Sequence, residues 1–128
     1  MPPMILVIEP DTSSREFLAT FLTLEGYHVV SVSTADTALQ ILREENPALV
    51  LMETRLPDMN SLEFNDLVKK DRAHAQIPIV ALTTQMLPSE ENALADAGFS
   101  ACLFKPVSPA ALRIYIGQFI YSDINNNT

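Results

Sequence analysis

The sequence predicts an α/β protein built around a doubly wound parallel sheet. Five short apolar runs, rich in Val, Ile and Leu, alternate along the chain with segments in which apolar residues recur at helical spacing. The connections between these segments are short, and parallel neighbouring strands need a crossover helix. Strict alternation with short connections therefore predicts one sheet with helices on both of its faces.

Each apolar run is too short for a helix and has the composition of a strand that is buried on both faces. The expected strands span residues 4–8, 28–32, 49–52, 77–82 and 101–104. The chain contains no internal repeat and no low-complexity linker between these strands. At 128 residues it has the length of one ordinary domain with a sizeable core.

Start and stop signals bound the expected helices. Ser13 and Glu16 form a capping-box pattern before the first helix, and Gly26 is expected to close that helix. Asn60 with Glu63 is expected to cap the third helix in the same way. These signals place helices between the strands, as the alternating pattern requires.

Composition and charge limit the classes of function. The residues are 48% hydrophobic and 19% charged, as in a globular domain. The formal net charge is −8 and the 8 basic residues are scattered, which argues against nucleic acid as a direct ligand. The chain shows no signal-peptide pattern and no apolar run long enough to span a bilayer. We therefore expect a cytoplasmic protein without membrane contact.

Cysteine and histidine usage indicates no metal or redox site. Cys102 is the single cysteine, which excludes an internal disulfide and a multi-cysteine metal site. We expect Cys102 to be a small buried hydrophobic residue. His28 stands at the start of an expected strand and His74 in a polar loop. We expect both histidines to be solvated, without a metal or phosphotransfer role.

Polar residues follow four of the expected strands. These residues are Glu9, Glu53, Thr83 and Lys105. The carboxyl ends of parallel strands meet at one edge of a sheet, and ligands of such sheets bind outside that edge. We therefore expect two carboxylates, a hydroxyl and an ammonium to converge there.

Four longer stretches of the chain read, in order, ILVIEPD, ALVLMETRLPDMNSLEF, IPIVALTTQ and LFKPV. In order and spacing they resemble the CheY-like receiver domain of bacterial response regulators, over nearly the whole chain. The resemblance implies a flavodoxin-like (βα)5 fold with strand order 2-1-3-4-5. It also implies a receiver domain over residues 1–122, followed by a disordered tail over residues 123–128.

The resemblance places Glu53 at the phosphoacceptor position, where the family has an aspartate. An adjacent pair of acidic residues holds magnesium in the family, and here the pair reads Glu9 and Pro10. Glutamate adds one methylene, which moves the attacking oxygen by roughly 1.5 Å, and proline supplies no carboxylate. Asp11 could replace the missing acid only if the loop bulged by one residue. We expect no cofactor, no metal and at most weak magnesium binding, with Glu9 as the candidate ligand.

Three further positions carry over from the family. Thr83 matches the hydroxyl after strand four, Lys105 matches the lysine after strand five, and Cys102 stands where the family has a switch aromatic. A Glu53–Lys105 pair could hold an active-like state, with a charge of −1 against roughly −2 for a phosphoryl group. The equally open alternative is a vestigial ion pair with a purely structural role.

The last expected helix carries two apolar stripes. The inward stripe, which should pack on the sheet, comprises Leu112, Tyr115, Ile116 and Phe119. The outward stripe comprises Ile114, Gly117 and Tyr121. An apolar outer stripe is typical of a partner surface. We therefore expect contact with another protein, including a second copy of the chain, through this helix.

The preferred hypothesis from the sequence is a signalling module, not an enzyme, that acts by protein–protein interaction without aspartyl phosphorylation. Its expected partners are a signalling kinase, an output domain or a second copy, with no direct nucleic acid. The alternative is a phosphorylation-competent response regulator receiver that uses Glu53 and magnesium. A third reading is a pseudo-receiver that binds a small anion near Lys105.

Overall fold

The computed structural model describes residues 2–84 and 86–126. Within these residues strands and helices alternate along the whole chain. The strands are β1 (Met4–Ile8), β2 (His28–Val32), β3 (Leu49–Glu53), β4 (Ile79–Thr83) and β5 (Ala101–Phe104). The helices are α1 (Thr12–Leu24), α2 (Ala35–Glu44), α3 (Ser61–Lys70), α4 (Pro88–Asp96) and α5 (Pro109–Asn126). None of the helices in this part of the chain is both long and apolar enough to cross a membrane.

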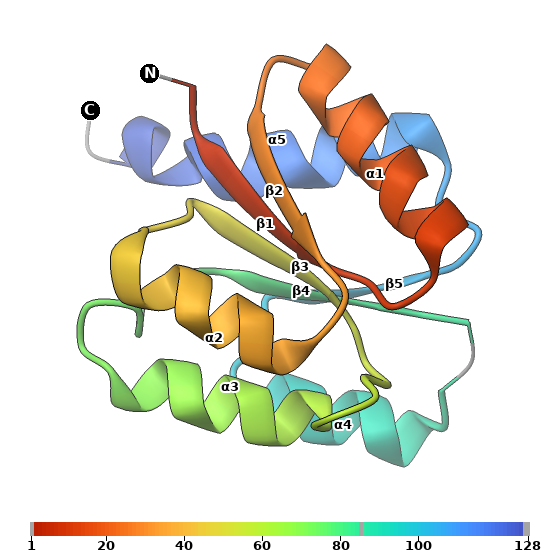
Figure 1. Ribbon diagram of the computed structural model, residues 1–128, viewed down its shortest axis with the longest axis vertical. Helices are drawn as coiled ribbons and strands as arrows, with labels where there is room; N and C mark the ends of the chain where they lie inside the picture. The colour runs from red at the N-terminus through yellow and green to blue at the C-terminus, as the bar shows by residue number, and fades with distance from the viewer. Residues whose placement is uncertain (1, 85, 127–128) are drawn as a thin grey trace.

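The five strands form one parallel sheet in the order β2-β1-β3-β4-β5. Helices α1 and α5 cover one face, and α2, α3 and α4 cover the other (Figure 1). The expected flavodoxin-like α/β fold and its strand order are therefore confirmed. In this topology the carboxyl ends of β1, β3, β4 and β5 bring Glu9, Glu53, Thr83 and Lys105 to one edge of the sheet.

Two hydrophobic cores lie on opposite faces of the sheet, and β1 shows how one strand supplies both. Leu6 and Ile8 pack into the core under α2, α3 and α4, whereas Ile5 and Val7 pack into the core under α1 and α5. All four side chains are fully buried. Successive strand residues point to opposite faces, so a strand covered on both sides needs a continuous apolar run.

The observed N-caps of α1 and α3 can be compared with the capping residues expected from the sequence. The Asn60 side chain accepts a hydrogen bond from the Glu63 N–H at 2.9 Å, as expected for α3. For α1 the expectation was wrong, because the cap is Asp11 and not Ser13. The Asp11 carboxylate accepts the Ser14 N–H at 2.8 Å, and α1 begins at Thr12. Asp, Ser and Asn are equally good caps, so a run of them leaves the first helical residue open in sequence.

Other boundaries lie close to expectation. Gly26 follows α1 with φ 99°, the left-handed conformation that closes helices. β4 begins at Ile79 and not at residue 77, since Pro78 has no N–H for the sheet. α5 runs to Asn126 and so includes the start of the expected tail over residues 123–128. Residues 127 and 128 lie outside the described residues.

One residue of the expected inward face of α5 points elsewhere. Leu112 and Ile116 are fully buried and Phe119 packs at the border of the core. Tyr115, however, is 41% exposed, so its assignment to the buried face was wrong. Neighbouring helical residues are rotated by about 100°. Because Ile116 faces the sheet, the Tyr115 side chain points to the side of the helix and not into the core.

Candidate functional site

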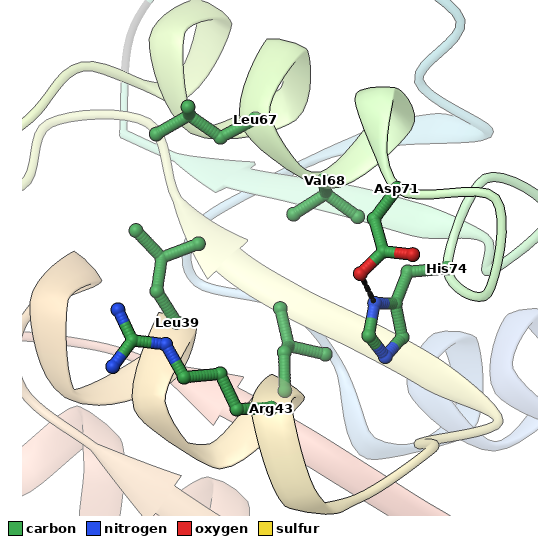
Figure 2. A pocket seen from close by; sticks show the side chains of 7 residues that line it. Leu39, Arg43, Leu67, Val68, Asp71 and His74 are labelled. Carbon is green, nitrogen blue, oxygen red and sulfur yellow. Dashed lines mark hydrogen bonds and ion pairs between the residues drawn. The ribbon is translucent and has the colours of Figure 1, made fainter.

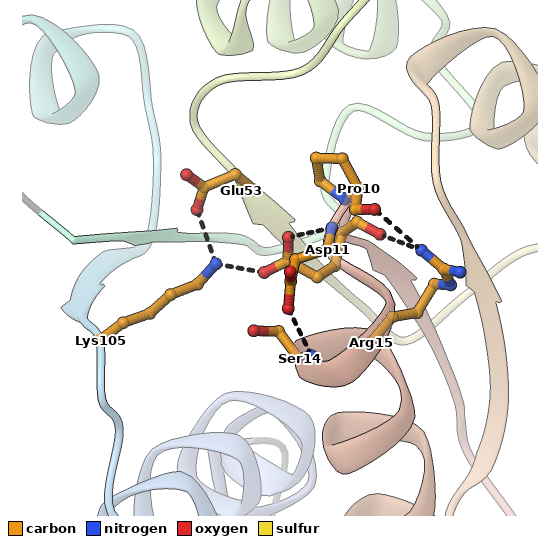
Figure 3. Close-up of polar contacts among 7 residues, drawn as sticks. Pro10, Asp11, Ser14, Arg15, Glu53 and Lys105 are labelled. Atoms are coloured by element: carbon orange, nitrogen blue, oxygen red, sulfur yellow. Dashed lines mark hydrogen bonds and ion pairs between the residues drawn. The ribbon is translucent and has the colours of Figure 1, made fainter.

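The carboxyl edge of the sheet brings acidic and basic side chains together. Glu9 directly follows β1, Glu53 is the last residue of β3, and Lys105 directly follows β5. The Lys105 ammonium lies between the two carboxylates (Figure 3). Its Nζ is 3.1 Å from Oε2 of Glu53 and also donates to Oε1 of Glu9. The residues that sequence reasoning placed at this edge therefore form a three-membered ion-pair cluster.

This cluster is largely shielded from water. The side chains are 1% exposed in Glu9, 13% in Glu53 and 18% in Lys105. Among the described residues, the buried Oε2 of Glu53 accepts no hydrogen bond, so its contact with Lys105 is an ion pair without hydrogen-bond geometry. The cluster holds two carboxylates and one ammonium, so it has a formal charge of −1 when all three groups are ionised.

Burial and the neighbouring charges act on the protonation of Glu53 and Lys105. Burial raises the pKa of Glu53, Lys105 lowers it, and nearby Glu9 raises it again, so that the pKa stays above its ordinary value. Burial lowers the pKa of Lys105, but the hydrogen bond from Lys105 to Glu9 and its attraction to both carboxylates outweigh burial and raise it. Lys105 is therefore held as a cation.

The backbone around β1 fixes Glu9 in this position. The Asp11 N–H donates to Oε2 of Glu9 at 3.1 Å, while Lys105 contacts Oε1. Nη1 of Arg15 donates to the carbonyl oxygens of Glu9 at 2.8 Å and Pro10 at 3.3 Å. Both carboxylate oxygens of Glu9 are therefore engaged by the protein itself.

The β1–α1 connection offers few free carboxylate oxygens to a metal ion. Pro10 has no side-chain oxygen, and both oxygens of Glu9 already have partners. Asp11 does not replace the missing acid, because its carboxylate caps α1 through the Ser14 N–H. That bond lowers the pKa of Asp11. Within the described ranges, no group of three or more His, Cys, Asp or Glu side chains is arranged to hold a metal ion.

Thr83 and Cys102 lie near this edge on the two neighbouring strands β4 and β5. Thr83 is buried, and its carbonyl oxygen accepts the Lys105 N–H at 2.7 Å. Cys102 is half-buried, with its Sγ 4.0 Å from Sδ of Met86. Burial raises the pKa of the Cys102 thiol, and the carboxylates of Glu91 and Glu53 raise it further. This thiol is therefore a packing residue and not an activated nucleophile.

Sequence reasoning missed one residue that organises the loop after Glu53. The Asp58 carboxylate accepts the N–H groups of Ala35 at 3.0 Å and Asp36 at 2.9 Å, at the first turn of α2. These two hydrogen bonds, the one from Asp36 first, lower the pKa of Asp58. The contact spans more than twenty residues of sequence, so no local motif could have indicated it.

One histidine expected to be solvated is buried. His74 is 7% exposed, and its Nδ1 lies 3.2 Å from Oδ2 of Asp71. It lines a cavity of about 240 Å³ between α2 and α3, with Leu39 and Leu67 on the walls (Figure 2). The expectation failed because the loop after α3 folds back onto the apolar stripes of the two helices. His28 is exposed, as expected.

Comparisons with known proteins agree with the fold and identify the family. The family described as response regulator receiver domain matches residues 5–116. The polar-differentiation response regulator DivK of Brucella anthropi is 27% identical over 122 residues, covering 92% of this chain and 99% of DivK.

Solved receiver structures superpose closely on this chain. A CheY-like response regulator receiver domain protein from Methanospirillum hungatei has a TM-score of 0.90 at 25% identity, covering 98% of this chain and 99% of its own. The receiver domain of the sensor histidine kinase PA1611 from Pseudomonas aeruginosa, solved with a magnesium ion in its active-site cleft, has a TM-score of 0.85 at 23% identity. It covers 94% of this chain and is covered over 98% of its own length. The chain therefore belongs to the response regulator receiver domain family of two-component signalling.

Proposed function

We propose that this receiver signals through protein contacts without phosphorylation at its acceptor position, as a pseudo-receiver with glutamate in place of the acceptor aspartate. The observation that carries the proposal is the position of Lys105, whose ammonium is already shared between the carboxylates of Glu53 and Glu9. In the family's reaction this lysine and a magnesium ion neutralise the incoming phosphoryl group. Here the chain's own side chains neutralise the lysine.

The length of Glu53 also argues against its use as a nucleophile. In-line attack on a phosphoryl group depends on position, and a misplacement of about 1 Å can cost on the order of 10²-fold in rate. The extra methylene of glutamate moves the carboxylate by roughly one C–C bond. Its oxygen Oε2 is buried against Lys105 and is not free for an incoming phosphoryl group.

We further propose that the domain does not depend on magnesium. The PA1611 receiver was solved with that ion in its cleft, whereas this chain has Pro10 in the acidic pair. Magnesium is usually held by one or two carboxylates together with phosphate oxygens and water. A magnesium ion near Glu9 would have to displace either the Lys105 ammonium or the Asp11 N–H.

The same cluster supplies a fixed conformation for partners to recognise. Receiver domains interact with kinases and output domains, and those partners respond to the conformation around the lysine. The ion pair between Glu53 and Lys105 links the segment after β5 to the end of β3 without a phosphoryl group. Cys102 has no aromatic ring that could turn inward on activation. Its small side chain is therefore consistent with a conformation that does not switch.

A magnesium titration followed by the amide spectrum of the domain tests this proposal. We expect wild-type amides near Glu9, Glu53 and Lys105 to stay unchanged in millimolar magnesium. A variant carrying Pro10→Asp and Glu53→Asp, which rebuilds the acidic site, should shift in the same titration. Saturable shifts in the wild type would overturn the proposal in favour of a magnesium-dependent receiver. Shifts with inorganic phosphate alone would instead favour an anion site at Lys105.

A further inference from the structure

The cavity between α2 and α3 lies far from the ion-pair cluster. It is lined by residues near the carboxyl ends of these two helices, which return to the amino edge of the sheet (Figures 1 and 2). Its walls are formed by the apolar side chains of Leu39, Leu42, Leu67 and Val68, and its volume is about 240 Å³. An apolar cavity of roughly 150 Å³ is large enough to hold benzene. This cavity therefore has room for a larger aromatic molecule.

The cavity can be entered from the surface beside Arg43 and Leu67. Arg43 is exposed and Leu67 is 45% exposed, although both line the cavity. Within the described part of the chain, Arg43 forms no ion pair. A guanidinium attracts the face of an aromatic ring. The position of Arg43 therefore favours an aromatic ligand over an aliphatic one.

His74 supplies a buried hydrogen-bond acceptor at the wall of this cavity. Its side chain is 9% exposed, and its Nδ1 lies 3.2 Å from Oδ2 of Asp71. An ionised carboxylate only accepts hydrogen bonds, so Nδ1 carries the proton and Nε2 of the neutral ring has a free lone pair. No group of the described residues donates to Nε2, which is directed away from Asp71 in Figure 2. Because buried polar atoms are normally paired, this acceptor indicates a ligand that donates.

The turn after α3 holds the imidazole of His74 in a fixed orientation. The second carboxylate oxygen of Asp71, Oδ1, accepts the Ala73 N–H at 2.9 Å. The His74 N–H donates to the carbonyl oxygen of Asp71 at 3.0 Å, and the His74 carbonyl oxygen accepts the Ile77 N–H at 3.1 Å. The acceptor is therefore positioned before any ligand arrives, which reduces the entropy lost on binding.

The charges around the cavity favour a neutral ligand. The Asp71 side chain is 57% exposed and lines the cavity beside His74. A neighbouring cavity of about 330 Å³, which shares Asp71 and His74, is also lined by Glu44 and Glu45. These carboxylates and the net charge of −8 repel an anion. An anionic ligand is therefore disfavoured in spite of the positive charge of Arg43.

We propose that the cavity between α2 and α3 binds a small neutral aromatic molecule that carries one N–H or O–H donor. The ring packs among the leucine side chains and against the guanidinium of Arg43, and the donor forms a hydrogen bond to Nε2 of His74. The site goes beyond the proposed function and shares no residue with the ion-pair cluster. Failure of either proposal therefore leaves the other unchanged.

Titration with indole and with benzofuran, followed by the amide spectrum of the domain, tests the proposal. The two probes have nearly the same shape, but benzofuran has an oxygen where indole has its N–H. We expect saturable shifts of amides in α2, α3 and the turn around His74, with a dissociation constant roughly fivefold lower for indole. His74→Leu keeps an apolar side chain in the wall and should abolish the preference for indole while benzofuran still binds.

A pair of tryptophan variants on α3 tests the location of the site. Leu67→Trp places a larger side chain in the cavity wall and should weaken indole binding by roughly tenfold or more. Leu62→Trp, at a 42% exposed leucine that does not line this cavity, is the matched control and should leave indole binding unchanged. The proposal would be overturned by a wild type without saturable shifts in indole, or by a His74→Leu variant that still prefers indole. Equal weakening in both tryptophan variants would also overturn it.

Discussion

Oε2 of Glu53 lies 3.1 Å from Nζ of Lys105, although β4 separates the strands that carry the two residues. The contact is possible because parallel strands end at the same edge and both side chains are long. Glu9 reaches the same ammonium from β1. The ends of β1, β3 and β5 are therefore linked by ion pairs at the edge of the sheet where receiver domains bind their phosphoryl group.

Replacing Glu53 by glutamine should change how stability depends on pH. Because the pKa of Glu53 is raised in the folded state, the folded protein binds more protons than the unfolded chain above pH 4.5. Wild-type stability should therefore fall, relative to Glu53→Gln, as the pH rises from about 4.5 through the raised pKa. Chemical denaturation of both proteins at a series of pH values measures this difference.

Glu44→Gln, at an exposed position of α2, is a suitable control for that series. The interpretation of Glu53 would be wrong if the wild type instead gained stability over Glu53→Gln with rising pH. That sign would mean that attraction to Lys105 exceeds the cost of burying Glu53.

Removing the Lys105 charge should destabilise the fold strongly. Lys105→Met leaves Glu9, which is 1% exposed, and Glu53 as neighbouring carboxylates without their shared cation. Breaking such a buried pair costs about 3–5 kcal/mol of unfolding free energy. Adding Glu9→Gln to Lys105→Met should restore part of the loss, as measured by urea denaturation. Equal stability of Lys105→Met and wild type would show that the cluster is not shielded from water as described.

Removing the cap of α3 should have a smaller effect. Asn60 accepts the Glu63 N–H at 2.9 Å, and its Nδ2 donates to the Glu63 carboxylate at 2.7 Å. Asn60→Ala should lower the unfolding free energy by about 1 kcal/mol, whereas Asn60→Asp should retain most of it. Urea denaturation of the three proteins is the measurement, and an alanine variant as stable as wild type would contradict the assigned cap.

The link from Asp58 to α2 should be sensitive to acid. Because two backbone hydrogen bonds lower the pKa of Asp58, its stabilising effect is complete above pH 3.8 and disappears as the pH falls through the lowered value. Asp58→Asn should therefore melt below wild type at neutral pH, with a difference that shrinks in acid. Thermal melts between pH 7 and pH 3 measure it, and a difference that does not vary with pH would contradict this role.

The edge residues could be predicted because strand ends are determined by the apolar pattern. Runs buried on both faces fix where β1, β3 and β5 stop, so the positions of Glu9, Glu53 and Lys105 follow from the topology. Which carboxylate the lysine contacts could not be predicted. That depends on the rotamers of three side chains and on the Asp11 N–H that orients Glu9.

Features set by tertiary packing were the ones missed. The partner of Asp58 is the start of α2, which is far away in sequence, and His74 is buried only because its loop folds over α2 and α3. Tyr115 fits a helical apolar stripe, but it is rotated by about 100° around α5 from the buried Ile116 and is exposed. Local patterns report which residues share a face and not how far the opposing surface extends.

The intact mass of the domain after incubation with magnesium and acetyl phosphate reports directly whether Glu53 accepts a phosphoryl group. The wild type is measured beside the Pro10→Asp, Glu53→Asp double variant, with Glu53→Gln as a blank at the acceptor position. We predict a phosphoryl adduct on the double variant alone. An adduct of equal yield on the wild type, located at Glu53 by peptide mapping, would show that the domain is an ordinary phosphorylation switch.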